Sequence, residues 1–127
     1  MTGSLIETQF AALQAMHPSS TKSAMGDGTE LVTVPVVMLP PGWNQSQTGI
    51  SFLIPVGFPM ARPDCFWADA TLRLANGGMP HASGVSQVPS IAEPRLWFSW
   101  HLGSWNPVTD TFLTYVRVIH NRFAQGN

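Results

Sequence analysis

Residues 96–123 read LWFSWHLGSWNPVTDTFLTYVRVIHNRF, and this stretch decides the fold of the chain. It opens with a densely aromatic run that reaches His101. Asn106 and Pro107 then predict a helix start, because Asn is a favoured N-cap and Pro is favoured at the first helical position. Further on, apolar residues recur at helical spacing as Phe112, Val116, Ile119 and Phe123. Such a stripe predicts a C-terminal helix that packs on a sheet.

Three apolar segments upstream predict the strands of that sheet. They occupy residues 31–39, 50–54 and 65–74. Pro35 interrupts the first and has no backbone N–H, so it indicates an edge strand or a bulge. Because the segments follow one another along the chain, we expect a meander of about three or four antiparallel strands, with the helix packed across it.

A helix is also predicted at the N-terminus. Ser4 and Glu7 have the spacing of a capping box, and apolar residues then recur at helical spacing as Ile6, Phe10 and Leu13. Pro18 ends the pattern, because proline disfavours helix in the residue before it. Residues 19–29 and 76–95 are rich in Gly, Pro and small polar residues, so we expect loops there. The whole pattern predicts one α+β domain over residues 1–127.

The charge balance narrows the class of partner. The chain has six Lys and Arg, seven Asp and Glu and a net charge of -1. The basic residues are scattered, which argues against nucleic acid, because phosphate binding needs clustered Lys and Arg. Pro and Gly break every apolar stretch before the ~20 residues that a membrane span needs. With no signal-peptide pattern and a lone Cys65, we expect a cytoplasmic protein.

The order of these elements resembles the ubiquitin-conjugating enzyme (UBC) superfamily. Phe58-Pro59, followed by Pro63, is similar to the family's Tyr-Pro and the prolines after it, and residues 105–107, Trp-Asn-Pro, are similar to its Trp-Ser-Pro. The aromatic run at residues 97–101 resembles a divergent bacterial branch. The resemblance implies a UBC-like fold, a ubiquitin-like protein and its activating enzyme as partners, and no cofactor. Since the chain ends at Asn127, we expect it to lack two further helices common in eukaryotic members.

The chain departs from the family at the catalytic position. Conjugating enzymes carry a thioester-forming Cys shortly before the Trp-Ser-Pro, where residues 97–99 stand here without a cysteine. The family's His-Pro-Asn has no true copy, because residues 79–81 match it only superficially. Cys65 is the one thiol that could carry a thioester, and it is displaced to the start of the third predicted strand.

Cys65 and His101 are the candidate catalytic residues. Cys65 could be a nucleophile activated by a nearby base, or a small buried hydrophobe beside apolar neighbours. Asp64 next to it would disfavour the thiolate, so a base is needed from elsewhere. His101 is the natural candidate, because imidazole exchanges protons near neutral pH. Its alternative role is a structural hydrogen bond.

Most of the five Trp are expected to fill the core. Trp43 and Trp100 are the candidates for a partner surface, since Trp is enriched at binding hot spots. Trp43, on the loop after Pro40-Pro41-Gly42, is expected to be the most exposed. The four His are dispersed along the chain and show no metal-ligand spacing, so we expect no metal site.

The leading interpretation is a conjugating-enzyme-like component of a bacterial ubiquitin-like protein pathway, with Cys65 as acyl carrier. One alternative is a catalytically inactive module of the same fold that binds a ubiquitin-like protein or its activating enzyme. A small structural protein with an unrelated α+β fold is a third. The sequence indicates neither the oligomeric state nor the identity of the ubiquitin-like protein.

Overall fold

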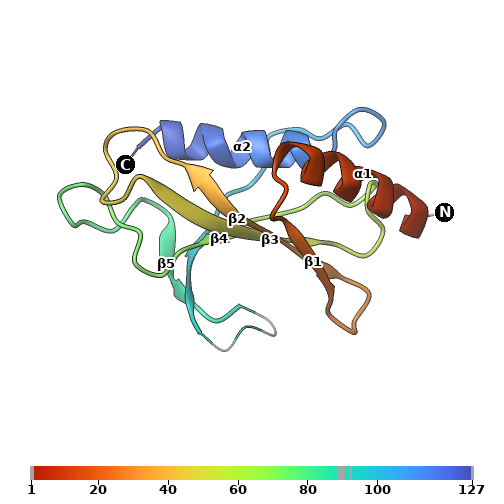
Figure 1. Cartoon of the computed structure of the whole chain (residues 1–127), viewed down its shortest axis with the longest axis horizontal. Coiled ribbons are helices and arrows are strands. Elements are labelled where there is room, and N and C mark those ends of the chain that lie inside the picture. Colours follow the sequence, from red (N-terminus) through yellow and green to blue (C-terminus); the bar gives the residue numbers. More distant parts are fainter. Residues whose placement is uncertain (1, 89–90, 92, 127) are drawn as a thin grey trace.

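Two helices cover one face of an antiparallel sheet (Figure 1). The structure, a computed structural model, describes residues 2–88, 91 and 93–126. Its elements in chain order are α1 (Thr2–Met16), β1 (Thr21–Ala24), β2 (Glu30–Met38), β3 (Gln47–Ile54), β4 (Phe66–Ala68), β5 (Ser83–Ser86), β6 (Arg95–Phe98) and α2 (Phe112–Ala124). Among the described residues, the six strands follow the spatial order β1-β2-β3-β4-β6-β5, and all neighbours are antiparallel. The predicted α+β, UBC-like arrangement is confirmed.

The apolar stripe of α2 is buried against the sheet, as predicted. Its members are 0–3% exposed: Phe112, Val116, Ile119 and Phe123. The ring of Phe123 meets Phe66 and Phe98 edge-on, at centroid distances of 5.7 and 5.8 Å. Those two rings come from β4 and β6 and stack on each other at 4.7 Å. An aromatic cluster therefore joins α2 to the centre of the sheet.

The predicted start of this helix is wrong. The helix begins at Phe112 and is capped by Thr111, whose hydroxyl accepts a hydrogen bond from the backbone N–H of Thr114. The Asn106 side chain instead accepts from the N–H of Val108, two residues on, at 2.9 Å. Asn side chains favour such local turns as much as helix caps, and here a turn precedes the helix.

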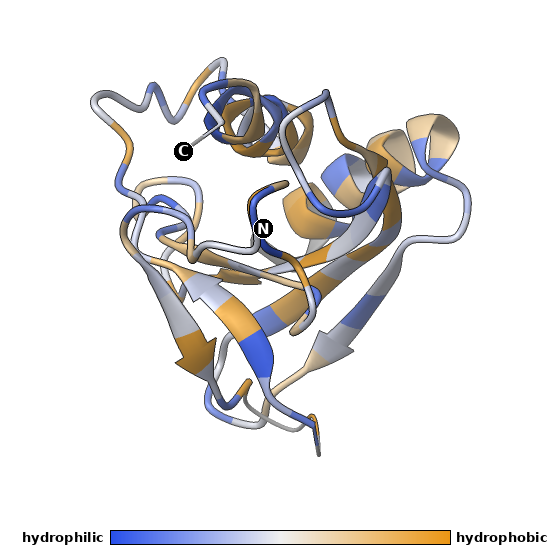
Figure 2. Ribbon diagram, turned by 90° about the vertical axis from the view of Figure 1, so that its left-hand side faces the viewer, coloured by the Kyte–Doolittle hydropathy of each residue, from blue (hydrophilic) through white to orange (hydrophobic). Residues whose placement is uncertain are grey.

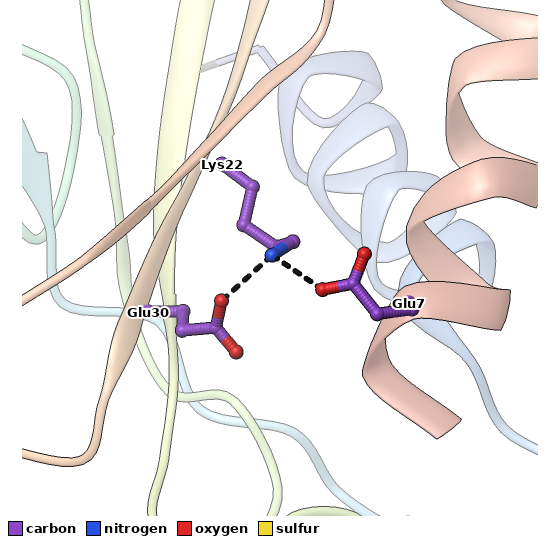
Figure 3. Close-up of polar contacts among 3 residues, drawn as sticks. All are labelled: Glu7, Lys22 and Glu30. Atoms are coloured by element: carbon purple, nitrogen blue, oxygen red, sulfur yellow. Dashed lines mark hydrogen bonds and ion pairs between the residues drawn. The ribbon is translucent and has the colours of Figure 1, made fainter. Parts of the chain in front are cut away.

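The N-terminal helix ends at Met16, just before His17-Pro18, as predicted. Its predicted capping box is wrong, because α1 begins at Thr2 and Ser4 lies inside it. Glu7 instead contacts Lys22 on β1 at 2.8 Å, and Lys22 also contacts Glu30 on β2 at 2.9 Å (Figure 3). This ion-pair group ties the helix to the edge of the sheet.

The strand predictions are confirmed at β2 and β3 and corrected elsewhere. The register of β2 against β3 shifts between Val34 and Val37, at Pro35, where an edge strand or a bulge was expected. The bulge is observed, and the edge-strand alternative is wrong because β2 lies between β1 and β3. The predicted third segment is shorter than expected: β4 stops at Ala68, and Leu74 makes only an isolated bridge with Trp43. The supposed loops contain β1 and β5, which pair with neighbouring strands despite their small polar residues.

Both faces of the sheet carry apolar side chains. Figure 2 shows apolar and polar residues interleaved along the strands and helices. On the face away from the helices, Leu31, Trp67 and Val88 form a second, smaller buried cluster, and Trp97 packs partly against it. The expectation that Trp side chains fill the core between sheet and helix therefore does not hold for Trp67 and Trp97. Among the described residues, no helix is long and apolar enough to span a membrane.

Candidate active site

Cys65 lies at the point where β4 begins and β6 has just ended. The antiparallel register pairs Phe66 with Phe98. The residue before Phe66 therefore meets the residues after Phe98, and the Cys65 N–H donates to the carbonyl of Trp100 at 3.0 Å. Strand pairing thus brings the thiol next to the segment that carries His101.

The backbone of Cys65 is held in an uncommon conformation. Its φ is +61°, in the left-handed region that residues with a Cβ rarely adopt. Its carbonyl accepts a hydrogen bond from the Tyr115 hydroxyl of α2 at 2.6 Å. Such a conformation costs on the order of 1–3 kcal/mol and persists where the surroundings impose it, often at functional sites. Hydrogen bonds to Trp100, in the segment after β6, and from Tyr115 on α2 supply that constraint.

His101 and Asp64 complete a cluster around the thiol. The Nδ1 of His101 lies 2.7 Å from the Oδ1 of Asp64, and the two side chains are 64% and 57% exposed. A carboxylate oxygen of Asp64, the Sγ of Cys65 and a ring nitrogen of His101 all lie within 4.8 Å of one another. A thiol, an imidazole and a carboxylate are the parts of a Cys-His-Asp arrangement for nucleophilic catalysis.

The surroundings favour the protonated thiol. Partial burial raises the pKa of the Cys65 thiol, the charge of Asp64 raises it further, and a backbone hydrogen bond from Trp100 opposes both. Burial also raises the pKa of Tyr115, with Cys65 and Asp64 adding to the effect. Tyr115 therefore keeps its proton and can donate to the Cys65 carbonyl. A reactive Cys65 needs a base, and His101 is the group in place.

The two motifs behind the family resemblance contact each other beside this cluster. The indole N–H of Trp105 donates to the carbonyl of Pro59 at 2.8 Å. The rings of Trp105 and Phe58 lie 6.0 Å apart, and Phe58 is 5.3 Å from Phe112 at the start of α2. These contacts hold the loop before Cys65 against the loop after His101.

The structure corrects one candidate for partner binding. Trp43 was expected to be exposed, yet it is 7% exposed and belongs to the core. Its indole N–H donates to the carbonyl of Phe123 at 3.0 Å, and the two rings meet edge-on at 5.5 Å. The loop that carries Trp43 folds back over the end of α2. Trp43 is therefore buried, although the prolines and polar residues around it in the sequence had suggested an exposed loop. Trp43 is therefore a structural residue.

Trp100 is partly exposed and remains a predicted partner-contact residue. The guanidinium of Arg122 lies over its ring, 5.2 Å from the centroid. Its backbone carbonyl holds Cys65, so a partner that covers Trp100 would also lie next to the thiol.

Sequence reasoning found Cys65 and His101 but missed two residues that contact them. Asp64 was considered only as an unfavourable charge, whereas the structure pairs it with His101. Tyr115 lies beside the predicted stripe of α2, and nothing local indicated that its hydroxyl reaches Cys65. The expectation of no metal site rested on the spacing of the His residues and on the lone cysteine. The three donors at Asp64, Cys65 and His101 are of different types and come from two separate segments, so neither argument considered them together.

The N-terminal helix, the six-stranded antiparallel sheet and the C-terminal helix form an α+β domain consistent with the UBC-like fold. A family comparison agrees: residues 17–126 match the model of prokaryotic E2 family E. The chain belongs to this family and is an E2-like protein of bacterial conjugation-like systems. Neither a curated protein nor a solved structure matches the chain significantly.

Proposed function

We propose that the protein is an acyl carrier in a bacterial ubiquitin-like conjugation pathway, with Cys65 as its nucleophile. The observation that carries this proposal is the position of Cys65, whose Sγ lies within 4.8 Å of donor atoms of both His101 and Asp64. The chain has one cysteine, so it is the only residue that can form a thioester. A lone catalytic thiol suits a reducing cytoplasm.

In this mechanism His101 removes the thiol proton and Asp64 orients the imidazole through the 2.7 Å contact. The Cys65 thiolate attacks the activated C-terminal carbonyl of a ubiquitin-like protein. A carbon–sulfur bond forms to Cys65, and the bond to the activating group breaks. An acceptor amine then attacks the thioester, an amide bond forms, and the carbon–sulfur bond breaks to release the thiol of Cys65.

The partners that follow are a ubiquitin-like protein and its activating enzyme. Trp100, partly exposed beside Cys65, is the residue that we assign to their binding surface. Aromatic side chains at the edge of a site supply contact area at low entropic cost, which suits transient partners.

A second candidate function is a binding module of the same fold that forms no thioester. The raised pKa of the Cys65 thiol favours it, because burial and the charge of Asp64 both suppress the thiolate. In that case the protein would hold the same partners without acyl transfer.

The test incubates the protein with a cognate activating enzyme, ATP and ubiquitin-like protein, and looks for an adduct that a thiol reductant removes. We expect the adduct in the unaltered chain and none in Cys65→Ala. His101→Ala should slow its formation by about 100-fold, within the range typical of a general base. His81→Ala is the matched control, since His81 is exposed and outside the cluster.

Two outcomes would reject the acyl-carrier function. One is the absence of any reducible adduct while partner binding persists in Cys65→Ala, which would establish the binding module. The other is an adduct that survives in Cys65→Ala, which would place the attachment elsewhere on the chain.

A further inference from the structure

The cluster at Cys65 presents three different kinds of metal donor. A carboxylate oxygen of Asp64, the Sγ of Cys65 and a ring nitrogen of His101 lie within 4.8 Å of one another. Among the residues that the structure describes, no other group of three His, Cys, Asp or Glu side chains converges in this way. Sulfur, nitrogen and oxygen donors together are those that Zn²⁺ prefers, whereas Ca²⁺ and Mg²⁺ select oxygen alone.

The geometry is within reach of a tetrahedral ion. With metal–sulfur and metal–nitrogen distances of about 2.3 and 2.0 Å, the donors of such an ion lie about 3.5 Å apart. Closing from 4.8 Å or less requires side-chain movements on the order of 1 Å, within the range of rotamer adjustment. The side chains of His101 and Asp64 are 64% and 57% exposed, so core packing does not fix their rotamers, and their 2.7 Å contact would open on binding.

The backbone of Cys65 is held in place by hydrogen bonds, so the position of the sulfur donor is restricted. Its N–H is bonded to the Trp100 carbonyl and its own carbonyl to the Tyr115 hydroxyl. The backbone of the sulfur donor is therefore anchored by the segment after β6 and by α2, and the two donors that would close around it are exposed side chains. Three protein donors leave the fourth position of a tetrahedral ion to water or another small ligand, as in open three-donor sites.

The geometry points to an open binding site for Zn²⁺, or a similar borderline divalent transition-metal ion, formed by Asp64, Cys65 and His101. On binding, the thiol of Cys65 releases its proton to solvent and the sulfur coordinates the ion. The contact between His101 and Asp64 is replaced by their bonds to the metal. Metal and acyl group then exclude each other at one sulfur atom, a consequence that rests on the proposed function.

The experiment titrates the metal-free chain with Co²⁺, without any partner protein and in a reductant that contains no thiol. We expect one ion per chain and a thiolate-to-cobalt charge-transfer band in the near ultraviolet, which Zn²⁺ then abolishes by displacement. Cys65→Ser should lose the band. His101→Ala and Asp64→Asn should each weaken binding at least about tenfold, because even the partners of metal ligands contribute that much. His81→Ala should bind as the unaltered chain does.

A second measurement uses the unaltered chain and does not depend on how any variant folds. Stoichiometric Zn²⁺ should slow alkylation of Cys65 by iodoacetamide at least about tenfold, since coordinated sulfur is a poor nucleophile compared with free thiolate. A chelator should restore the rate. Unchanged alkylation in the presence of Zn²⁺ would overturn the proposal.

The site is also rejected if Co²⁺ gives no charge-transfer band, or if His101→Ala and Asp64→Asn both bind as the unaltered chain does. The latter result would mean adventitious binding by the thiol alone. Failure of this proposal is distinct from failure of the proposed function. If Co²⁺ binds but no thioester adduct forms, the metal site stands and the acyl-carrier function is rejected. If an adduct forms but Co²⁺ does not bind, the acyl-carrier function stands and the metal site is rejected.

Discussion

Phe123 on α2 and Cys65 just before β4 belong to two regions of the molecule that are built in different ways. Phe123 is fully buried, and its ring meets those of Phe66 and Phe98 edge-on beneath α2. Cys65, one residue before Phe66, has a left-handed backbone and lies between the exposed side chains of Asp64 and His101. The first region is buried and largely aromatic, and the second carries polar side chains that are exposed to solvent. We therefore expect stability to depend on the first and thiol chemistry on the second.

The largest effect on stability is expected from Phe123→Ala. The change removes an aromatic side chain from the buried cluster and leaves a cavity, which should lower the free energy of unfolding by about 3–5 kcal/mol. Chemical denaturation followed by tryptophan fluorescence measures it. Arg117→Ala, at an exposed position of the same helix, is the control and should change stability by less than about 0.5 kcal/mol. A loss below about 1 kcal/mol for Phe123→Ala would contradict the buried cluster.

Tyr115→Phe probes the residue that joins the two regions. The variant keeps the ring in the core but removes the hydroxyl that donates to the Cys65 carbonyl at 2.6 Å. Leaving a partly buried carbonyl without this donor should cost about 1–2 kcal/mol in unfolding free energy. Because the bond also holds the backbone at Cys65, the alkylation rate of the thiol should change as well. Identical stability and identical alkylation in the variant would show that the two regions are not coupled through Tyr115.

A smaller loss of stability is expected from Lys22→Met on β1, which removes the ion pairs with Glu7 of α1 and Glu30 of β2. Ion pairs of this kind contribute about 0.2–1 kcal/mol each. Hydrogen bonds to Glu7 and then to Glu30 raise the pKa of Lys22 above its ordinary value. The contribution is therefore complete at neutral pH and is lost as the pH rises through the raised value. Unfolding curves of variant and unaltered chain should converge at strongly alkaline pH, and a difference that persists there would contradict the ion-pair origin.

Asp64→Asn should leave the free energy of unfolding within about 0.5 kcal/mol of that of the unaltered chain, because the side chain is exposed. The same variant should change the reactivity of the Cys65 thiol. Burial and then the charge of Asp64 raise the pKa of Cys65, so removing the charge lowers that pKa but leaves the effect of burial. The pH profile of iodoacetamide alkylation should shift to lower pH, with a faster rate at neutral pH. Thioester formation should slow, because His101 loses its orienting partner.

The same charge change at a distant position is the control for this shift. Asp27→Asn lies in the turn between β1 and β2 and should leave the alkylation profile unchanged. A profile that shifts equally in both variants would show a general charge effect. A large loss of stability in Asp64→Asn would contradict the separation of the two regions.

Local sequence signals determined much of the helix-covered region. The stripe on α2 and the end of α1 before Pro18 were predicted, and Pro35 indicated either a bulge or an edge strand, because periodicity and proline act over a few residues. Only the pairing with β1 decided for the bulge. The same signals gave a wrong helix start at Asn106. Both Asn106 and Thr111 are suitable N-cap residues by type, and in the structure Thr111 caps the helix. Strand β1 was missed because its pairing with β2, not its own composition, makes it a strand.

Only the tertiary structure decided the candidate site. The sequence alone singled out Cys65 as the only thiol and His101 as a base, but it placed them 36 residues apart with nothing to show that they meet. The pairing of Phe66 with Phe98 brings Cys65 and His101 close together, because this register of the antiparallel ladder places the start of β4 beside the end of β6. The same long-range packing turned Trp43 from an expected surface residue into a core residue, through its bond to Phe123. Composition and period are local properties, and the convergence of distant side chains depends on strand register and on the closure of the core.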